Sequence, residues 1–279
     1  MKKLVFVIVL LQLMVFANAD DRIRNYNDQI SFIFNLSNKF IINEMGIVEY
    51  PENSYMMYKI TYNNSNALNN RRYLIISCNH GNEIAPVYAI KDFILYLDSK
   101  EQVINNITID FIYILNPYGF EYNIRYNGQE KDLNRDFITV KTPEIKIFIN
   151  SIKDTQYVGM YDFHEHGATK GFMLYYYANK NKELSKDILN MLKDNNIVLE
   201  NEWVDVILKT KDGSIYVPFY AKWYYRSILK QETTGLYFDR LNVDEVFTFE
   251  TPTYKNIEER KLIIDLILKY LFEYNIKNK

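Results

Sequence analysis

The sequence predicts an α/β protein: a single domain with a mixed, mostly parallel sheet and helices on both faces. Two observations support this fold class. Short apolar segments alternate along the chain with longer amphipathic ones, which is the pattern of strands followed by helices. No repeat, proline-rich linker or low-complexity block divides the 279 residues, of which 48% are hydrophobic. Parallel strands then end at a common edge of the sheet, where proteins of this class bind ligands.

The first nineteen residues are typical of a signal peptide rather than of a folded domain. Two lysines precede an apolar run over residues 4–16, and small residues follow at 17–19, where a signal peptidase reads them. The run is shorter than the roughly 20 residues of a membrane-spanning helix, which argues against an uncleaved anchor. We therefore expect residues 1–19 to be removed and residues 20–279 to form one domain. The protein would be secreted or periplasmic, without stable membrane insertion.

The domain is predicted to begin with a helix, followed by two strands and a second helix. Residues 22–43 have apolar side chains spaced for one side of a helix. Two apolar runs at 55–62 and 73–78 are short enough for strands, and the polar segment 63–70 between them is predicted to be a turn. Residues 84–98 return to helical spacing, so a helix is expected after the second strand.

Strands and helices continue to alternate in the rest of the chain. The clearest helix start is at residue 142, where Thr142 can cap the helix and Pro143 suits its first position. In chain order, the expected elements are a strand at 108–115, a helix at 142–152, a strand at 157–163, a helix at 182–194, a strand at 244–249 and a helix at 256–274.

Composition excludes several classes of function. The 33 lysine and arginine residues nearly balance the 35 aspartate and glutamate residues, so no basic excess argues for a nucleic-acid partner. Cys78 is the only cysteine, which rules out an internal disulfide and a cysteine-based zinc site. Because it lies in an apolar run, we interpret it as a buried, inert thiol rather than a catalytic one.

The three histidines all lie at the ends of predicted strands. His80 follows one strand, and His164 and His166 follow another. His80 and Glu83 form a His-x-x-Glu pair that offers two of the ligands zinc prefers. A histidine from the other strand would complete a set of two imidazoles and one carboxylate, which leaves a coordination position open for water. Spacing does not choose between His164 and His166, because both face the same side of a strand.

A second group of motifs lies between and beyond these histidines. It consists of Asn116-Pro-Tyr-Gly119, Arg125, Asp132-Leu-Asn134-Arg135 and, at the end of the last predicted strand, Thr248-Phe249-Glu250. With His80-x-x-Glu83 and the later histidine, these motifs occur in an order that resembles the M14-like zinc metallocarboxypeptidases, from about residue 45 to about residue 275. They are also similar to the related succinylglutamate desuccinylase/aspartoacylase group, which carries His-Gly-x-Glu, Asp-x-Asn-Arg and Asp-Leu-His.

The resemblance implies a zinc site with one zinc ion per chain. His80, Glu83 and His164 would be its ligands. His164 is preferred to His166 because Asp162-Phe163-His164 looks like the Asp-x-His that ends the corresponding strand in related sequences.

The resemblance also implies the residues that act on the substrate. Glu250 would be the catalytic glutamate, which moves a proton from the attacking water to the leaving amine. Arg125 would help to hold the developing oxyanion. Asn134 and Arg135 would bind the terminal carboxylate of a peptide, for which the planar fork of an arginine is suited.

The sequence departs from the family pattern in three places. Where the family usually has Asn-Pro-Asp-Gly, this sequence has Tyr118 in the third position. Where the family has Asn-Arg-Asn-Phe, this sequence has Asp136 in the third position. The tyrosine that well-known members bring over the substrate is not found, since its equivalent falls near Leu208. The aromatic residues of the segment 216–225 are interpreted mainly as core packing, with a contribution to the rim of a specificity pocket as the alternative.

We therefore expect an exported zinc metallocarboxypeptidase that hydrolyses the C-terminal bond of peptides with a free carboxylate, cell-wall peptides being candidates. The alternative is a zinc-dependent N-acyl amino acid deacylase, which Asp162-Phe163-His164 favours. The nine-residue step from Arg125 to Asn134, the glycine of Asn116-Pro-x-Gly119 and the signal peptide favour the carboxypeptidase. The intact motifs argue against a binding domain without activity. The residue removed, its stereochemistry and the oligomeric state are left open.

Overall fold

The computed structural model describes residues 24–63, 71–100, 106–202, 204–205 and 208–275. The predicted signal peptide at 1–19 and nearly all of the predicted turn at 63–70 lie outside these residues. Within the part of the chain that is described, no helix is both long and apolar enough to cross a membrane.

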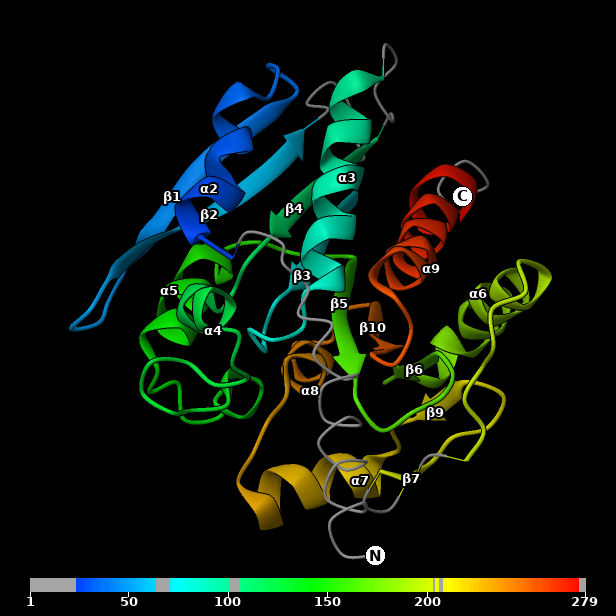
Figure 1. Cartoon of the computed structure of the whole chain (residues 1–279). Coiled ribbons are helices and arrows are strands. Elements are labelled where there is room, and N and C mark those ends of the chain that lie inside the picture. The colour runs from blue at the N-terminus through cyan, green and yellow to red at the C-terminus, as the bar shows by residue number, and fades with distance from the viewer. Residues whose placement is uncertain (1–23, 64–70, 101–105, 203, 206–207, 276–279) are drawn as a thin grey trace, which may run out of the picture.

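The domain is built on a mixed sheet of eight strands, shown in Figure 1. Their order across the sheet is β1-β2-β4-β3-β5-β10-β6-β9. The strands are β1 (Phe40–Glu49), β2 (Ser54–Asn63), β3 (Arg71–Ser77), β4 (Ile107–Ile112), β5 (Gly159–His166), β6 (Met173–Tyr176), β9 (Ser214–Tyr216) and β10 (Glu245–Pro252). Two further strands, β7 (Val204–Asp205) and β8 (Leu208–Lys209), pair with each other in a separate two-stranded sheet.

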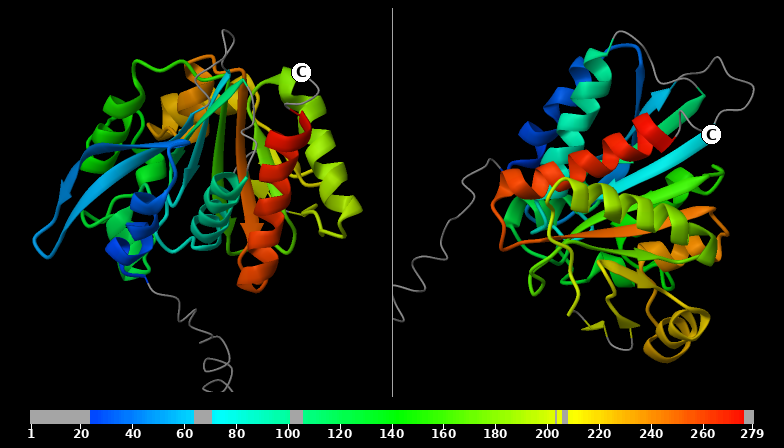
Figure 2. Two further views of the ribbon diagram at one scale, coloured as in Figure 1. Left: turned by 90° about the horizontal axis from the view of Figure 1, so that it is seen from above. Right: turned by 90° about the vertical axis from the view of Figure 1, so that its right-hand side faces the viewer.

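The four central strands β4, β3, β5 and β10 run parallel, whereas β1, β2 and β6 join antiparallel to their inner neighbours. Figure 2 shows the helices on both sides of this sheet. The helices α2 (Tyr26–Ile30), α3 (Ala85–Ser99), α6 (Lys182–Asp194) and α9 (Ile257–Lys269) pack in the core of one face, and α5 (Pro143–Ile152) and α8 (Thr234–Arg240) in that of the other. The predicted fold class is confirmed.

The predicted helix at 22–43 is wrong over most of its length. It is replaced by the short α2, the 3-10 turn η1 (Ser31–Asn35) and the edge strand β1. Leu36 has an extended backbone, which ends the helical segment, and β1 then pairs with β2 along its whole length. The apolar residues of β1 satisfied a helical spacing by coincidence, while its β-branched residues and the neighbouring strand favour the sheet.

Other differences are smaller but affect the site. β5 continues through His166, so His164 and His166 lie inside the strand rather than after it. Pro143 is the first residue of α5, as predicted, but the Thr142 hydroxyl donates to Asp136 instead of capping the helix. The last helix ends at Lys269 and passes into the π-helical segment η5 (Tyr270–Asn275). The strands β6 and β9 and the helices α4 (Pro117–Tyr122), α7 (Phe219–Trp223) and α8 were not predicted.

Candidate metal centre and active site

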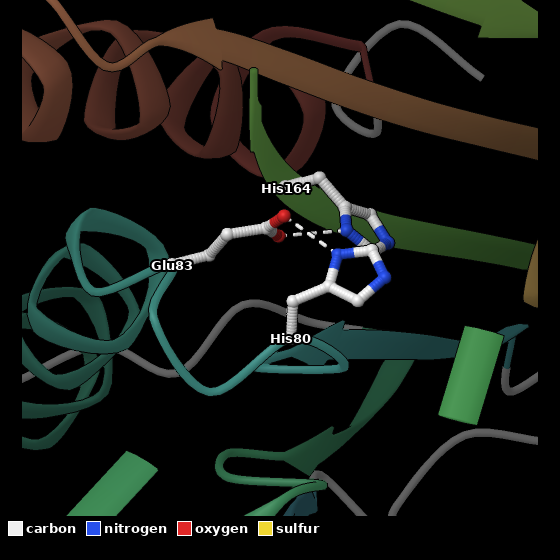
Figure 3. Close-up of side chains that lie close together, drawn as sticks. All are labelled: His80, Glu83 and His164. Atoms are coloured by element: carbon white, nitrogen blue, oxygen red, sulfur yellow. Dashed lines mark hydrogen bonds and ion pairs between the residues drawn. The ribbon is translucent and has the colours of Figure 1, made fainter. Parts of the chain in front are cut away.

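Three side chains meet at the carboxyl end of the sheet: His164 from β5, and His80 and Glu83 from the turn after the neighbouring parallel strand β3 (Figure 3). His80 Nδ1 lies 2.6 Å from Glu83 Oε1, and His164 Nδ1 lies 2.8 Å from Glu83 Oε2. One possible ligand atom from each residue lies within 4.8 Å of the others, and all three residues are buried. The structure therefore brings together the three predicted zinc ligands. Their function as ligands stays a prediction.

His166 stands outside this group although it is only two residues from His164. It is half-buried, and its Nδ1 accepts a hydrogen bond of 3.3 Å from the backbone N–H of Ala168. The described residues contain one group of side chains with metal-binding spacing, and His164 is the histidine of β5 that belongs to it. The geometry thus favours His164 over His166, as the Asp-x-His motif did.

A carboxylate holds the far nitrogen of each imidazole. His80 Nε2 lies 3.2 Å from Asp132 Oδ1, and His164 Nε2 lies 2.9 Å from Asp162 Oδ2. With the ring proton on Nε2, each histidine leaves the lone pair of Nδ1 directed toward Glu83 and a metal ion. Ligating histidines are commonly oriented by a carboxylate in this way, so the donor set fits zinc in its chemistry as well as in its spacing.

The charges around the two imidazoles also fit a cation. Burial would raise the pKa of Glu83, but His80 and His164 outweigh it and hold that pKa far below its usual range. Burial would likewise lower the pKa of His164, but Asp162 and Glu83 raise it well above its usual value. Asp132, which contacts His80, is the third carboxylate of the site after Glu83 and Asp162. The site therefore concentrates negative charge and favours either protonated imidazoles or a bound cation.

Arg125 reaches this site through Asp132. Its Nε and Nη2 donate hydrogen bonds of 3.1 and 2.9 Å to Asp132 Oδ2, and its Nη1 lies 3.9 Å from Glu83 Oε1. The loop between Arg125 and Asp132 is held by Asn127, whose Oδ1 accepts the backbone N–H groups of Gln129 and Lys131. The structure places Arg125 at the edge of the candidate active site, while its role toward an oxyanion stays a prediction.

Two glycines set the shape of the turn that carries His80 and Glu83. A Cβ on Gly81 would lie 1.8 Å from the backbone carbon of Gly119, so only glycine allows this close approach. Asn116 fixes the second loop: its Oδ1 accepts the N–H of Gly119 at 2.9 Å, and its Nδ2 donates to the carbonyl of Arg125 at 3.3 Å. The Asn-Pro-Tyr-Gly motif therefore supports the turn of the metal site, and its third residue, Tyr118, is not needed for these contacts.

A cavity of about 180 Å³ opens beside the metal site. The predicted site residues His80, Glu83, Arg125, Asn134, Arg135 and Glu250 all line it. Another part of its wall consists of uncharged side chains, namely Tyr175, Tyr177, Leu208, Val217, Tyr225 and Leu236. The cavity therefore joins a charged end, which His80 and Glu83 of the candidate metal site line, to a wall suited to an apolar or aromatic group.

Glu250 lies next to His164, because β10 and β5 pair in register at these two residues. Burial raises the pKa of Glu250 to about 8, with a further contribution from Glu83 and an opposing one from His164. A carboxyl group in this position can hold or release a proton near neutral pH. The geometry is suited to the predicted role, which stays a prediction.

The two predicted carboxylate-binding residues differ in their surroundings. Asn134 is buried and bonded to Thr234, whereas Arg135 is half-buried and donates from Nη1 to the carbonyl of Asn134 at 2.8 Å. Thr234 and Asn79 were not predicted as site residues. Asn79 Nδ2 donates to Asp162 Oδ2 and to Thr234 Oγ1, both at 2.9 Å. The local sequence gives no signal for these contacts, because they join segments far apart in the chain.

Most aromatic side chains of the segment 216–225 do not pack in the core, contrary to our main interpretation, although Tyr225 packs against it. Tyr216 at the end of the edge strand β9, and Phe219, Tyr220 and Trp223 of α7, are exposed. Tyr225 does line the cavity, so the alternative interpretation holds for that residue. Leu208, the position nearest to the missing family tyrosine, forms part of the cavity wall.

Solved structures show which class of protein has this fold. A protein from Shewanella denitrificans OS217, described as a candidate metallopeptidase, has a TM-score of 0.71 at 16% identity, with 88% of this chain and 89% of that chain covered. A metallo-carboxypeptidase from Burkholderia cenocepacia has a TM-score of 0.70 at 12% identity, with 91% and 69% covered. At such low identities these likenesses establish the fold, which is that of the metallocarboxypeptidases.

Sequence comparison narrows the class further. Residues 69–202 match the succinylglutamate desuccinylase/aspartoacylase catalytic domain. A probable aspartoacylase from Prochlorococcus marinus strain MIT 9301 is 46% identical over 68 residues, which are 24% of this chain and 20% of that protein. Another from strain MIT 9515 is 37% identical over 75 residues, 26% of this chain and 23% of that protein. The matches thus span about a quarter or less of these relatives. The comparisons confirm the resemblance to an M14-like family of hydrolases related to the desuccinylase group.

Proposed function

We propose that the protein is a zinc-dependent metallocarboxypeptidase, which removes a C-terminal residue with an uncharged side chain from peptides. The observation that carries this proposal is the cavity, where the His80, Glu83 and His164 site adjoins two arginines and an uncharged wall. An arginine pair is suited to a free carboxylate, and the wall is suited to an apolar or aromatic side chain.

Zinc held by His80, Glu83 and His164 would supply a polarising positive charge and an activated water at neutral pH. Within this proposal, Glu250 accepts a proton at its carboxylate and later delivers it to the leaving amine. Its pKa of about 8 describes the site without a cation, and a bound cation would lower that value and favour the basic form.

Arg135 and Asn134 bind and orient the substrate in this proposal. The guanidinium of Arg135 is half-buried at the cavity, so it can reach a carboxylate with two parallel hydrogen bonds. Asn134 adds the amide N–H group that Thr234 does not occupy. Arg125 remains fixed by Asp132 and offers its positive charge close to Glu83, where a carbonyl oxygen would become negative.

The second candidate is an N-acyl amino acid deacylase. The match of residues 69–202 to the desuccinylase/aspartoacylase catalytic domain and the local identity to probable aspartoacylases favour it. Both candidates release an amino acid with a free carboxylate, so the same arginines would serve both. They differ in whether the uncharged wall receives the side chain of a peptide or the acyl group of a small substrate.

Product analysis distinguishes the two candidates. The zinc-loaded protein is incubated with N-blocked dipeptides that end in phenylalanine, lysine or glutamate, and with N-acetylaspartate and N-succinylglutamate. We expect release of phenylalanine to be fastest. Hydrolysis of only the acyl amino acids would favour the deacylase, and no hydrolysis of either set would contradict both candidates. Arg135→Gln should raise KM for substrates with a free carboxylate, while Lys131→Gln, an exposed neighbour, should not.

We further propose that residues 1–19 direct export and are then removed, so that the active protein is secreted or periplasmic. The basic start, apolar run and small residues of the sequence support this proposal. N-terminal sequencing of protein recovered outside the cytoplasm should begin at Asp20. A cytoplasmic protein that retains Met1 would contradict it.

A further inference from the structure

The segment after β9 exposes a group of large apolar side chains. Phe219, Tyr220 and Trp223 of α7, with Ile228 and Leu229 of the π-helical segment η4 (Tyr224–Leu229), form what we call the aromatic face. Phe219 is 81% exposed and Trp223 is 52% exposed. Since they are four residues apart on a helix, these two side chains lie on the same side of it. Figures 1 and 2 both show α7 and η4 at the outer edge of the molecule. Adjoining apolar side chains of this size are seldom left in water without a binding partner.

A groove of about 1010 Å³ adjoins the aromatic face. It runs between α6 and the segment from β8 to α7, and it is separate from the cavity of the metal site except for their shared residue Leu208. Its lining includes Lys182, Lys186, Lys193, Lys209 and Lys211. Tyr220 belongs both to this lining and to the aromatic face, so the two features form one continuous surface.

The surface keeps a basic excess after its own ion pairs are counted. Lys186 is paired with Glu183 at 2.7 Å, and Asp212 is the one acidic residue in the groove lining. The other groove lysines and Lys230, next to the aromatic face, are exposed. The chain as a whole has a formal charge of −2, so this basic surface is a local concentration.

We propose that the aromatic face and the lysine groove together dock the protein onto an anionic lipid surface. Phe219, Trp223 and Ile228 would enter the boundary between headgroups and acyl chains, where aromatic side chains are favoured. The lysines would lie at the level of the lipid phosphates and bind them by charge attraction. The docking is peripheral, which agrees with the lack of a spanning helix among the described residues.

The combination of features favours a lipid surface over other acidic partners. An acidic peptide or polymer would bind the lysine groove but would leave Phe219 and Trp223 in water. A neutral protein partner would cover those side chains but would have no use for the lysines. A bilayer with anionic headgroups satisfies both parts of the surface. Val217 and Tyr225 of the same segment line the catalytic cavity, so docking would hold that cavity close to the bilayer.

Vesicle binding tests the proposal with the full chain, without reference to any enzymatic activity. The protein is mixed with vesicles of phosphatidylcholine containing phosphatidylglycerol, with vesicles of phosphatidylcholine alone, and with soluble polyglutamate. We expect co-sedimentation with the anionic vesicles only, a blue shift of tryptophan emission that is absent in Trp223→Phe, and weakening by salt. Binding to polyglutamate but not to vesicles, equal binding to neutral vesicles, or no vesicle binding would each overturn the proposal.

Paired variants identify the surface. We test two double variants: one combines Phe219→Ser with Trp223→Ser, and the other combines Lys209→Glu with Lys211→Glu. Each should weaken binding to anionic vesicles by about tenfold or more. All four side chains are exposed, so far-UV circular dichroism and thermal unfolding should remain those of the wild type. Leu262→Ser on α9 and Lys146→Glu on α5 are matched controls with exposed side chains. Equal loss in the controls, or no loss in the paired variants, would show that another surface is responsible.

Discussion

Thr234 binds Asn134 through two hydrogen bonds to one oxygen, although the two residues are 100 positions apart in the chain. The backbone N–H of Thr234 donates to Asn134 Oδ1 at 2.8 Å, and its hydroxyl donates to the same atom at 3.0 Å. The hydroxyl also accepts from Asn79 Nδ2, which in turn donates to Asp162 Oδ2, the partner of His164. Thr234 therefore links the support of the metal site to the residue predicted to bind the substrate carboxylate.

Replacing Thr234 by valine should affect both stability and substrate binding. The change keeps the side-chain volume but removes the hydroxyl, so Asn79 loses an acceptor and Asn134 loses a donor. We expect about 1–3 kcal/mol lower stability in urea unfolding and a higher KM. Thr253→Val, at an exposed threonine, is the control and should change neither. An unchanged KM in the first variant would show that Thr234 only stabilises the fold.

Metal content should separate the three histidines. We expect His80→Ala and His164→Ala to lose bound zinc, because each removes one of three ligands. His166→Ala should keep it, since His166 stands outside the group of possible ligand atoms. Elemental analysis after dialysis gives the answer. Retention of one zinc per chain by the His164 variant, or equal loss in the His166 variant, would contradict the assignment.

Asp132 should affect the metal affinity without being a ligand. Asp132→Asn weakens the contact to His80 Nε2 and the ion pair to Arg125, so His80 loses its orientation. Loss of such a partner typically costs about 10–100-fold in metal affinity. Competition with a chelator measures the change. The exposed neighbour Glu130→Gln should bind zinc like the wild type, and equal affinities in all three proteins would refute the role of Asp132.

Glu250 should be needed for turnover but not for zinc. Glu250→Gln keeps the size of the side chain and removes its ability to accept a proton. We expect kcat to fall by about 10²–10⁴-fold, the usual contribution of a general acid–base group, with zinc content unchanged. Steady-state kinetics on the substrate identified by product analysis, with elemental analysis of the same sample, makes the comparison. A kcat within a few-fold of the wild type would exclude Glu250 as the proton carrier.

Glu200 should make stability depend on pH in the acid range. Its carboxylate accepts four backbone N–H groups, from Lys170, Gly171, Asn201 and Glu202. Burial alone would raise the pKa of Glu200, but these hydrogen bonds outweigh it and lower the pKa below the ordinary value.

The unfolded chain then binds more protons than the folded one as the pH falls. The stabilisation is complete above the unfolded pKa of about 4.3 and is lost as the pH falls through the lower folded value. Urea unfolding of wild type and Glu200→Gln should therefore converge toward low pH. The exposed Glu202→Gln is the control, and parallel stability curves for Glu200→Gln and wild type would refute this prediction.

Residues that act within a short segment were predictable. His80 and Glu83 share one turn, and the helix α6 has the predicted bounds because its apolar and polar residues alternate with a clear helical period. The end of the predicted helix at 22–43 was not predictable from its spacing, because these residues form the start of β1 and their structure is decided by pairing with β2. Thr234 and Asn79 were not predicted as site residues for a related reason. Their importance arises only when the sheet brings distant segments together.

The contact between Gly81 and Gly119 bears on how a metal ion would enter and leave the candidate site. The backbones of the two loops touch where any side chain would prevent it, so the turn with His80 and Glu83 rests on a fixed support. Such a turn keeps its shape whether an ion is present or not. We therefore expect a chelator to remove zinc from a protein that stays folded. Rebinding of zinc should proceed at the rate at which the ion loses its bound water, without a slow phase of chain rearrangement.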